Sequence, residues 1–165
     1  MSHNATQSLA PTRDFSIRMH PSRQGARLAR ELAAVWLRDR HATRPVAQTA
    51  VQLVAELAAN AALHGRVPGR DFLVELHVTE GDRALRVQVT DTRADRVPPA
   101  TPHAPGPDAE SGRGLLLVAR LASRWGVTAG PPPRKTVWAE LDLVPERGQP
   151  GSGTPGGLSH GADGY

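Results

Sequence analysis

The stretch ELAANAALHG, residues 56–65, ends an alanine-rich run that begins at Pro45 and predicts a helix. At about 100° per residue the apolar side chains share one face, and Glu56 and Asn60 lie at the border of that face on adjacent turns. Gly65 is typical of the C-terminal cap. Asn is a mediocre helix former, so its place inside the helix needs a reason. Either the two polar residues form an ordinary solvated edge, or one side of this helix lines a polar site.

The segments before this helix alternate between strand and helix periods. Residues 13–19 alternate as an edge strand does. Residues 22–40 predict a helix, opened by Pro21 and Ser22, whose apolar stripe is Leu28, Leu32, Val35 and Trp36.

The segments after it predict two strand pairs separated by a helix. Residues 71–78 and 84–91 form a hairpin, a helix follows Gly112, and residues 124–129 and 135–143 are the last strands. This order predicts an α+β fold, a two-layer α/β sandwich in which a mostly antiparallel mixed sheet carries helices on one face.

Composition sets the domain organisation and excludes several functions. We expect a flexible N-terminus over residues 1–12, one domain over 13–144, and a disordered Gly/Pro-rich tail over 145–165. The absence of cysteine excludes disulfides and Cys-ligated zinc, and no two of the seven histidines have metal-ligand spacing on one face. No 18-residue apolar run or secretory leader is present, so we expect a cytoplasmic protein with no membrane contact.

The basic residues say more about the type of genome that encodes the protein than about its function. Of 20 basic residues only Lys135 is lysine, and with the many Ala, Gly and Pro residues this points to a high-GC, actinobacterial type of coding sequence. The net charge is +4, and the arginines are interleaved with acidic residues. Direct nucleic-acid binding is therefore disfavoured, since there is neither a clustered basic face nor interleaved aromatics.

Asp91 and the glycines near residue 113 are two further irregularities. Asp91 has the inward parity of Val87 and Val89, where a carboxylate needs a hydrogen-bond partner, unless the strand ends at Thr90 and Asp91 begins a turn. After the long loop 92–111, Gly112, Arg113 and Gly114 open a helix, where free N–H groups attract phosphate. A hinge followed by a helix cap accounts for these glycines equally well.

Taken together, these motifs resemble the ATP-binding domain of the GHKL superfamily, which has the Bergerat fold. The closest likeness is to the bacterial anti-sigma factors that are also serine-protein kinases. It rests on ELAANAALHG, VQVTDTR, GRGLLLVARLASRWGV and KTVWAEL, and covers residues 13–144. The resemblance implies ATP and Mg²⁺ as cofactors, a sigma factor and a STAS-domain anti-anti-sigma protein as partners, and a homodimer in which the first helix, with Trp36, is a candidate contact surface.

The resemblance also implies roles for individual residues. Glu56 would be the catalytic base and Asn60 a Mg²⁺ ligand, while Asp91 would accept the adenine amino group. The remaining residues that it places at the nucleotide are Arg93, the phosphate-binding group Gly112, Arg113, Gly114 and Leu115, and the adenine-binding Thr136. Loop 92–111 would be a lid over the nucleotide.

One departure from the family pattern leaves two function classes open. The family often has glycines two and four residues after the aspartate, and this chain has Arg93 and Asp95. These side chains would crowd the purine, or Arg93 would stack on it. The first class is an ATP-dependent serine/threonine kinase that sequesters a sigma factor and phosphorylates its STAS partner. The second is a non-catalytic switch that works through protein contacts, with or without nucleotide.

Overall fold

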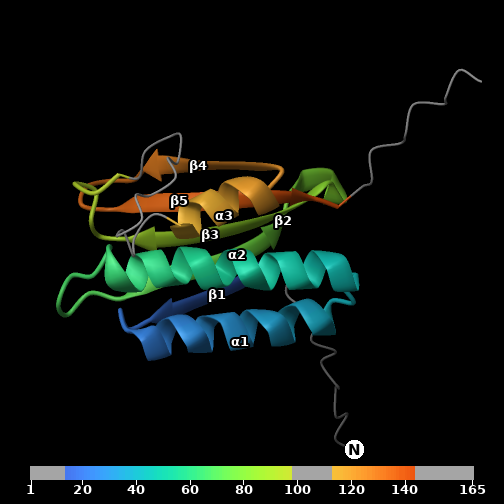
Figure 1. Ribbon diagram of the computed structural model, residues 1–165, viewed down its shortest axis with the longest axis horizontal. Helices are drawn as coiled ribbons and strands as arrows, with labels where there is room; N and C mark the ends of the chain where they lie inside the picture. The colour runs from blue at the N-terminus through green and yellow to red at the C-terminus, as the bar shows by residue number, and fades with distance from the viewer. Residues whose placement is uncertain (1–13, 98–112, 144–165) are drawn as a thin grey trace, which may run out of the picture.

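Five strands and three α-helices form the part of the chain that the structure, a computed structural model, describes, namely residues 14–97 and 113–143 (Figure 1). A short 3₁₀ turn, Glu80–Asp82, joins the second and third strands. In chain order the elements are β1 (Asp14–Met19), α1 (Arg23–Asp39), α2 (Arg44–Leu63), β2 (Phe72–Val78), β3 (Ala84–Asp91), α3 (Arg113–Leu121), β4 (Arg124–Ala129) and β5 (Lys135–Asp142).

The strands form one sheet in the order β1-β2-β3-β5-β4, and all four pairings of these described strands are antiparallel. The central pairing joins β3 to β5, which places Asp91 opposite Lys135 and Val89 opposite Val137. This pairing brings together two segments that are distant in the sequence. The predicted α+β architecture is confirmed.

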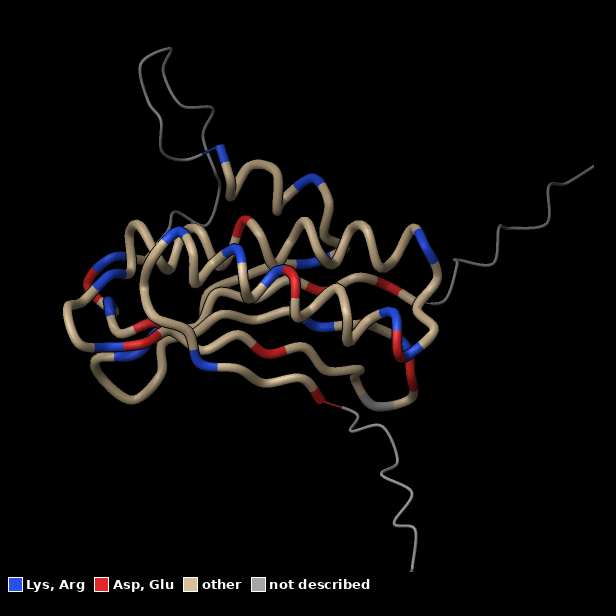
Figure 2. The backbone as a smooth tube through the Cα atoms, turned by 90° about the horizontal axis from the view of Figure 1, so that it is seen from below, with Lys and Arg blue, Asp and Glu red and all other residues tan. Residues whose placement is uncertain are grey.

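The helices lie on one face of the sheet, as Figure 2 shows in an edge-on view. Strict alternation of apolar residues along the strands produces this arrangement. Most inward positions of β2, β3 and β5 are buried, whereas the outward positions are mostly polar, with Leu73 and Trp138 as exceptions. On the outer face Arg86 stacks over Trp138 with its guanidinium carbon 4.1 Å from the ring centroid, and also bonds Glu140 at 2.9 Å. Charges of both signs lie interspersed in both layers (Figure 2).

Helix α2 is the core helix of the helical layer. It packs against α1, α3 and the sheet, and its fully buried positions meet Phe72 of β2, which is 1% exposed. The buried residues of α2 are Ala50, Leu53, Val54, Leu57, Ala58, Ala61 and Ala62. By length and mean hydropathy, 1.2, this helix also qualifies as a membrane span, but here those features serve its packing inside the domain.

Helix α1 buries a different face from the one its large apolar residues predict. Leu28 and Val35 are 44% and 45% exposed, so this part of the predicted stripe was wrong. The buried residues are small ones together with one leucine: Gly25, Ala26, Ala29, Ala33 and Leu37. Small side chains let α1 approach α2 closely, and that packing decides which face is inward. The helix begins at its predicted cap, where the Ser22 hydroxyl accepts the Gly25 N–H at 3.0 Å.

Several predictions fall on residues outside the described ranges. These are the flexible N-terminus 1–12, the tail 145–165, the phosphate-binding Gly112 and all of loop 92–111 beyond Val97. They stay predictions.

Candidate functional site

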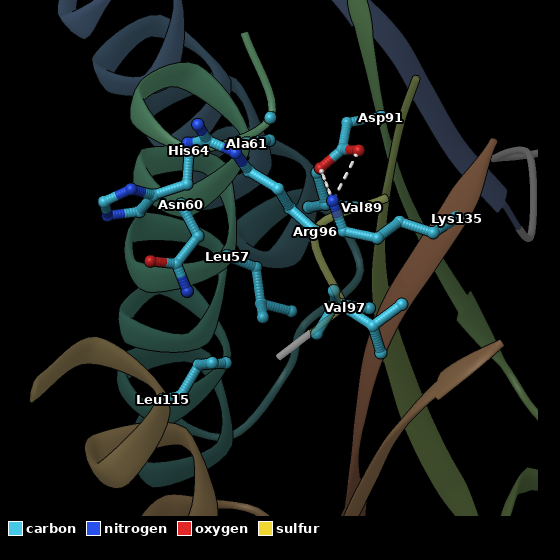
Figure 3. A pocket seen from close by; sticks show the side chains of 12 residues that line it. Leu57, Asn60, Ala61, His64, Val89, Asp91, Arg96, Val97, Leu115 and Lys135 are labelled. Atoms are coloured by element: carbon cyan, nitrogen blue, oxygen red, sulfur yellow. Dashed lines mark hydrogen bonds and ion pairs between the residues drawn. The ribbon is translucent and has the colours of Figure 1, made fainter. Parts of the chain in front are cut away.

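A cavity of about 390 Å³ opens between the C-terminal half of α2, the inward face of β3 and β5, and the start of α3 (Figure 3). Its walls are mainly apolar, and a few polar groups converge on it, which is the usual character of a small-molecule site. The described residues that line it are Leu57, Asn60, Ala61, His64, Gly65, Val89, Asp91, Arg96, Val97, Leu115, Lys135 and Val137.

Asp91 lies at one end of the cavity, buried as its strand parity predicts. It is 5% exposed, and its partner is Lys135, directly opposite on β5 and 4% exposed. The Lys135 ammonium donates to Asp91 Oδ1 at 2.8 Å and to Oδ2 at 3.0 Å, as the dashed lines in Figure 3 mark. The Arg93 amide donates to Oδ1 at 2.9 Å. The desolvated carboxylate is therefore compensated by a neighbouring cation and a backbone N–H.

Gly65 makes room for this carboxylate. A Cβ atom at residue 65 would lie 2.3 Å from Asp91 Oδ2 and 2.5 Å from its carboxyl carbon. The residue follows the end of α2 as predicted, and its N–H donates to the Asn60 carbonyl at 3.1 Å. Its φ is not in the left-handed region. Contact with Asp91, rather than a left-handed cap, explains glycine at this position.

Glu56, Asn60 and Gly114 meet at the other end of the cavity, which Asn60 lines and where α3 begins. A Cβ at Gly114 would lie 2.7 Å from Glu56 Oε2 and 3.7 Å from Asn60 Oδ1. Glu56 Oε1 accepts a hydrogen bond from Gln52 at 3.2 Å, while the described part of the chain offers no hydrogen-bond partner to Glu56 Oε2 or to the Asn60 side chain. The structure thus brings together three residues that the sequence singled out separately.

The oxygen atoms at this end are suitable ligands for a hard metal cation that is also bound by phosphate. Glu56 and Asn60 present uncommitted oxygen atoms, the ligand type that Mg²⁺ prefers. Within residues 14–97 and 113–143 there is no group of three His, Cys, Asp or Glu side chains that would hold a metal alone. A magnesium ion here would need phosphate oxygens and water to complete its shell. The first turn of α3, with Arg113, Gly114 and Leu115, supplies N–H groups suited to phosphate.

Arg93 and Asp95, which replace the family's glycines, bind each other. The Arg93 guanidinium donates to Asp95 Oδ1 at 2.8 Å and to Oδ2 at 2.7 Å. These hydrogen bonds lower the pKa of Asp95 to about 2. The Arg93 side chain is not among the described residues lining the cavity. Its backbone contributes instead, since its carbonyl accepts from Lys135 at 2.8 Å.

Thr136 lies on the opposite face of the sheet from Asp91. Its hydroxyl is 2.7 Å from the Thr90 hydroxyl, and it does not line the cavity. The adenine contact of Thr136 stays a prediction, and Lys135 is the β5 residue beside Asp91.

Neither Lys135 nor His64 was assigned to the site from the sequence, nor were the apolar lining residues other than Leu115, and Arg96 and Val97 were placed there only as part of the lid segment 92–111. Lys135 could have been predicted to face inward, because it lies two residues before the inward-facing Val137 on the same strand. Arg96 and Val97 belong to the segment expected to be a lid, and no pattern in that segment distinguishes them.

The chain matches one protein family over most of the described residues. The histidine kinase-like ATPase domain family matches residues 21–140. No curated protein matches the chain.

Two solved structures share the fold. One holds the RsbU and RsbW domains of Rv1364c from Mycobacterium tuberculosis, with 21% identity, a TM-score of 0.59 and 79% of this chain covered. This chain spans only 32% of that one. The other is the SiaB-SiaC complex from Pseudomonas aeruginosa, with 14% identity, a TM-score of 0.57, and 78% of this chain and 90% of that chain covered. At these identities the likeness concerns the fold. The family match over residues 21–140 carries the assignment, and the chain belongs to the histidine kinase-like ATPase domain family.

Proposed function

We propose that this protein is a cytoplasmic, ATP-dependent anti-sigma factor that sequesters a sigma factor and phosphorylates a serine of a STAS-type anti-anti-sigma partner. The observation that carries the proposal is the meeting of Glu56 and Asn60 with Gly114 at the first turn of α3. An acid and an amide with uncommitted oxygens, facing a helix N-terminus, match the needs of phosphoryl transfer. Membership of the ATPase family supports a nucleotide as the ligand.

The cavity accommodates the two parts of a nucleotide at different ends. The apolar walls around Leu57, Val89 and Val137 suit a base, whose end of the cavity is at Asp91. The phosphates then extend toward Asn60 and the amides of Arg113 and Gly114. In this proposal Asn60 Oδ1 is one ligand of a Mg²⁺ ion that neutralises phosphate charge.

Glu56 is assigned the proton transfer. Its carboxylate takes the proton of the partner's serine hydroxyl while the hydroxyl oxygen bonds to the γ-phosphorus. The bond from that phosphorus to the β–γ bridging oxygen breaks, and ADP leaves. The hydrogen bond from Gln52 holds one carboxylate oxygen and leaves Oε2 directed toward α3.

The partner assignments rest on the resemblance and on two structural neighbours that hold a complex or joined domains. One neighbour is a complex of SiaB with SiaC, and the other joins an RsbW domain to an RsbU domain. A homodimer through α1 is part of the proposal. On that helix Trp36 packs against Phe15 with ring centroids 6.1 Å apart and lies under Arg40.

A non-catalytic switch is the second candidate, favoured by the contacts around Asp91. The carboxylate is already bound by Lys135, and the segment after it begins with the Arg93–Asp95 ion pair where glycines would give freedom. In this candidate the partner interactions do not require phosphate transfer.

The deciding experiment is a pull-down from the native host with and without Mg-ATP, followed by phosphopeptide mapping of the retained proteins. The kinase proposal expects a phosphoserine on a retained STAS protein. Glu56→Gln should slow its formation by roughly 10²–10⁴-fold, the usual range for a general base. The matched control is Glu31→Gln, which removes an exposed carboxylate of α1 that pairs with Arg27 at 2.9 Å. Retention of partners with no phosphoserine in the wild type favours the switch.

A further inference from the structure

Lys135 places a buried cation at the end of the cavity assigned to the base. Its ammonium donates to Asp91 Oδ1 and Oδ2 and to the Arg93 carbonyl, at 2.8, 3.0 and 2.8 Å. An ammonium has three N–H donors, so all of them are in use. Among the described residues no buried side-chain nitrogen or oxygen lacks a partner. The pair is complete without a ligand.

The remaining approaches to the Asp91 carboxylate are restricted. Oδ1 accepts from both Lys135 and the Arg93 amide. Oδ2 accepts from Lys135 and lies against Gly65, where even a Cβ atom would come within 2.3 Å. A base amino group that used this carboxylate as its acceptor would have to displace Lys135 or crowd against Gly65.

Displacement of Lys135 by a neutral amino group is unfavourable. A bond from an ammonium to a carboxylate is stronger than one from a neutral amine. The displaced ammonium, 4% exposed here, would also remain desolvated without its counter-charge. The phosphate end differs, because Glu56 Oε2 and the Asn60 side chain carry no such commitments within the described chain.

We propose that Lys135 is the specificity-determining residue of this site: it occupies the carboxylate that would read the base, so nucleoside triphosphates bind through their phosphates with little selection for the 6-amino group of adenine. This inference rests on the proposed nucleotide site. It assigns the ligand class as nucleoside triphosphates with no requirement for the 6-amino group.

The test compares two ligands that differ only at position 6 of the purine. These are Mg-ATP and the Mg complex of purine riboside triphosphate, which has hydrogen in place of the amino group. Isothermal titration of the full chain should give dissociation constants within about threefold of each other for the wild type. Lys135→Thr should bind ATP at least tenfold more tightly than the wild type and should prefer ATP over the analogue by at least tenfold, because Asp91 is released.

Arg134→Thr is the matched control. It removes the same charge from the neighbouring position, whose exposed side chain does not line the 390 Å³ cavity, and should behave as the wild type does. If Lys135→Thr does not fold, Lys135→Met replaces it, with the same expected gain in ATP affinity. If neither variant folds, the ratio of the two dissociation constants of the wild type decides.

The outcomes separate this inference from the function on which it rests. A wild type that prefers ATP by tenfold or more overturns the role of Lys135 and leaves the nucleotide site standing. A folded Lys135→Thr protein that binds ATP no better than the wild type does the same. Failure of both proteins to bind either triphosphate overturns the nucleotide site and this inference together.

Discussion

Gly65→Ala tests whether the buried carboxylate of Asp91 dictates the backbone beside it. The new methyl carbon would lie 2.3 Å from Asp91 Oδ2 and 2.9 Å from the Ala61 carbonyl oxygen, whereas ordinary contacts begin near 3.4 Å. The carboxylate would therefore have to retreat by about 1 Å (3.4 minus 2.3). Its bonds to Lys135 and to the Arg93 amide, all between 2.8 and 3.0 Å, oppose that shift.

Three effects set the expected loss of stability, two that lower the free energy of unfolding and one that raises it. Overpacking a well-packed site costs about 1–3 kcal/mol. If the methyl group pushes Asp91 away from Lys135, the cost rises toward the roughly 3–5 kcal/mol seen when a buried ion pair is broken. Replacing glycine restricts the unfolded chain and returns about 0.4–1 kcal/mol. Together these effects lead us to expect that Gly65→Ala lowers the free energy of unfolding by about 2–4 kcal/mol.

Urea denaturation followed by circular dichroism measures this free energy. The control is Gly69→Ala, because a Cβ there meets nothing within 4 Å and only the positive φ of 77° is strained. Its net effect should stay within about 1 kcal/mol. Most of the Gly65→Ala penalty should also vanish in an Asp91→Ala background, as a double-mutant cycle would record. A Gly65→Ala protein as stable as Gly69→Ala, or an undiminished penalty without Asp91, would refute the reasoning.

Three other changes have defined outcomes. Asn60→Ala should reduce the gain in ATP affinity that Mg²⁺ confers by about tenfold, or 1.4 kcal/mol, in titrations with and without the metal; an unchanged gain contradicts the ligand role. Ser22→Ala should lower the free energy of unfolding by about 1 kcal/mol, since the Gly25 N–H loses its cap, and a neutral result in urea denaturation would count against that cap. Burial raises the pKa of Glu140, but hydrogen bonds from Arg124 and Arg86 outweigh it and leave the pKa below its usual value. Glu140 therefore adds stability above the unfolded-state pKa of about 4.3 that is lost as pH falls through the lower folded value; Glu140→Gln should flatten this acid limb, and parallel limbs would contradict the assignment.

The strands were predictable from the sequence because alternate residues of each strand face the helical layer and the outer surface. The inward residues of β3 face the helical layer, so Leu85, Val87 and Val89 alternate with polar residues, and β2 follows the same pattern from Val74 to Val78. The same parity predicted that Asp91 is buried. The parity of β5 implied that Lys135 faces inward and Thr136 outward, but the family resemblance drew attention to the threonine.

The helix face of α1 was not predictable from hydrophobicity alone. Leu28 and Val35 have large apolar side chains but remain exposed, whereas Ala29 and Ala33 are fully buried. The distance between two packed helices favours small residues at the contact, and this distance depends on the partner helix. A stripe of large residues therefore misidentified the inward face.

The pairing of Asp91 with Lys135 could not be predicted from the sequence either, because it depends on the register between β3 and β5. The two residues face each other only when β3 and β5 are neighbours in a particular alignment. A shift of one residue would turn Lys135 to the outer face. Neither the sequence between these strands nor the motif spacing specifies that alignment.

The two ends of the cavity differ in how firmly their polar groups are held, and this difference bears on the order of events during binding. At the end assigned to the base, Asp91 and Lys135 are buried and bonded to each other, and Gly65 lies directly against the carboxylate. At the phosphate end Glu56 and Asn60 are half-exposed, and the described residues give Glu56 only the bond from Gln52. A general base need not be aligned before its substrate arrives, and its hydrogen bonds often tighten only in the reactive complex. Phosphate and metal would therefore organise the residues that act on them, while the base end stays as it is. In the proposed function, the site would thus select its ligand at the end where its own polar groups have fewer hydrogen-bond partners among the described residues.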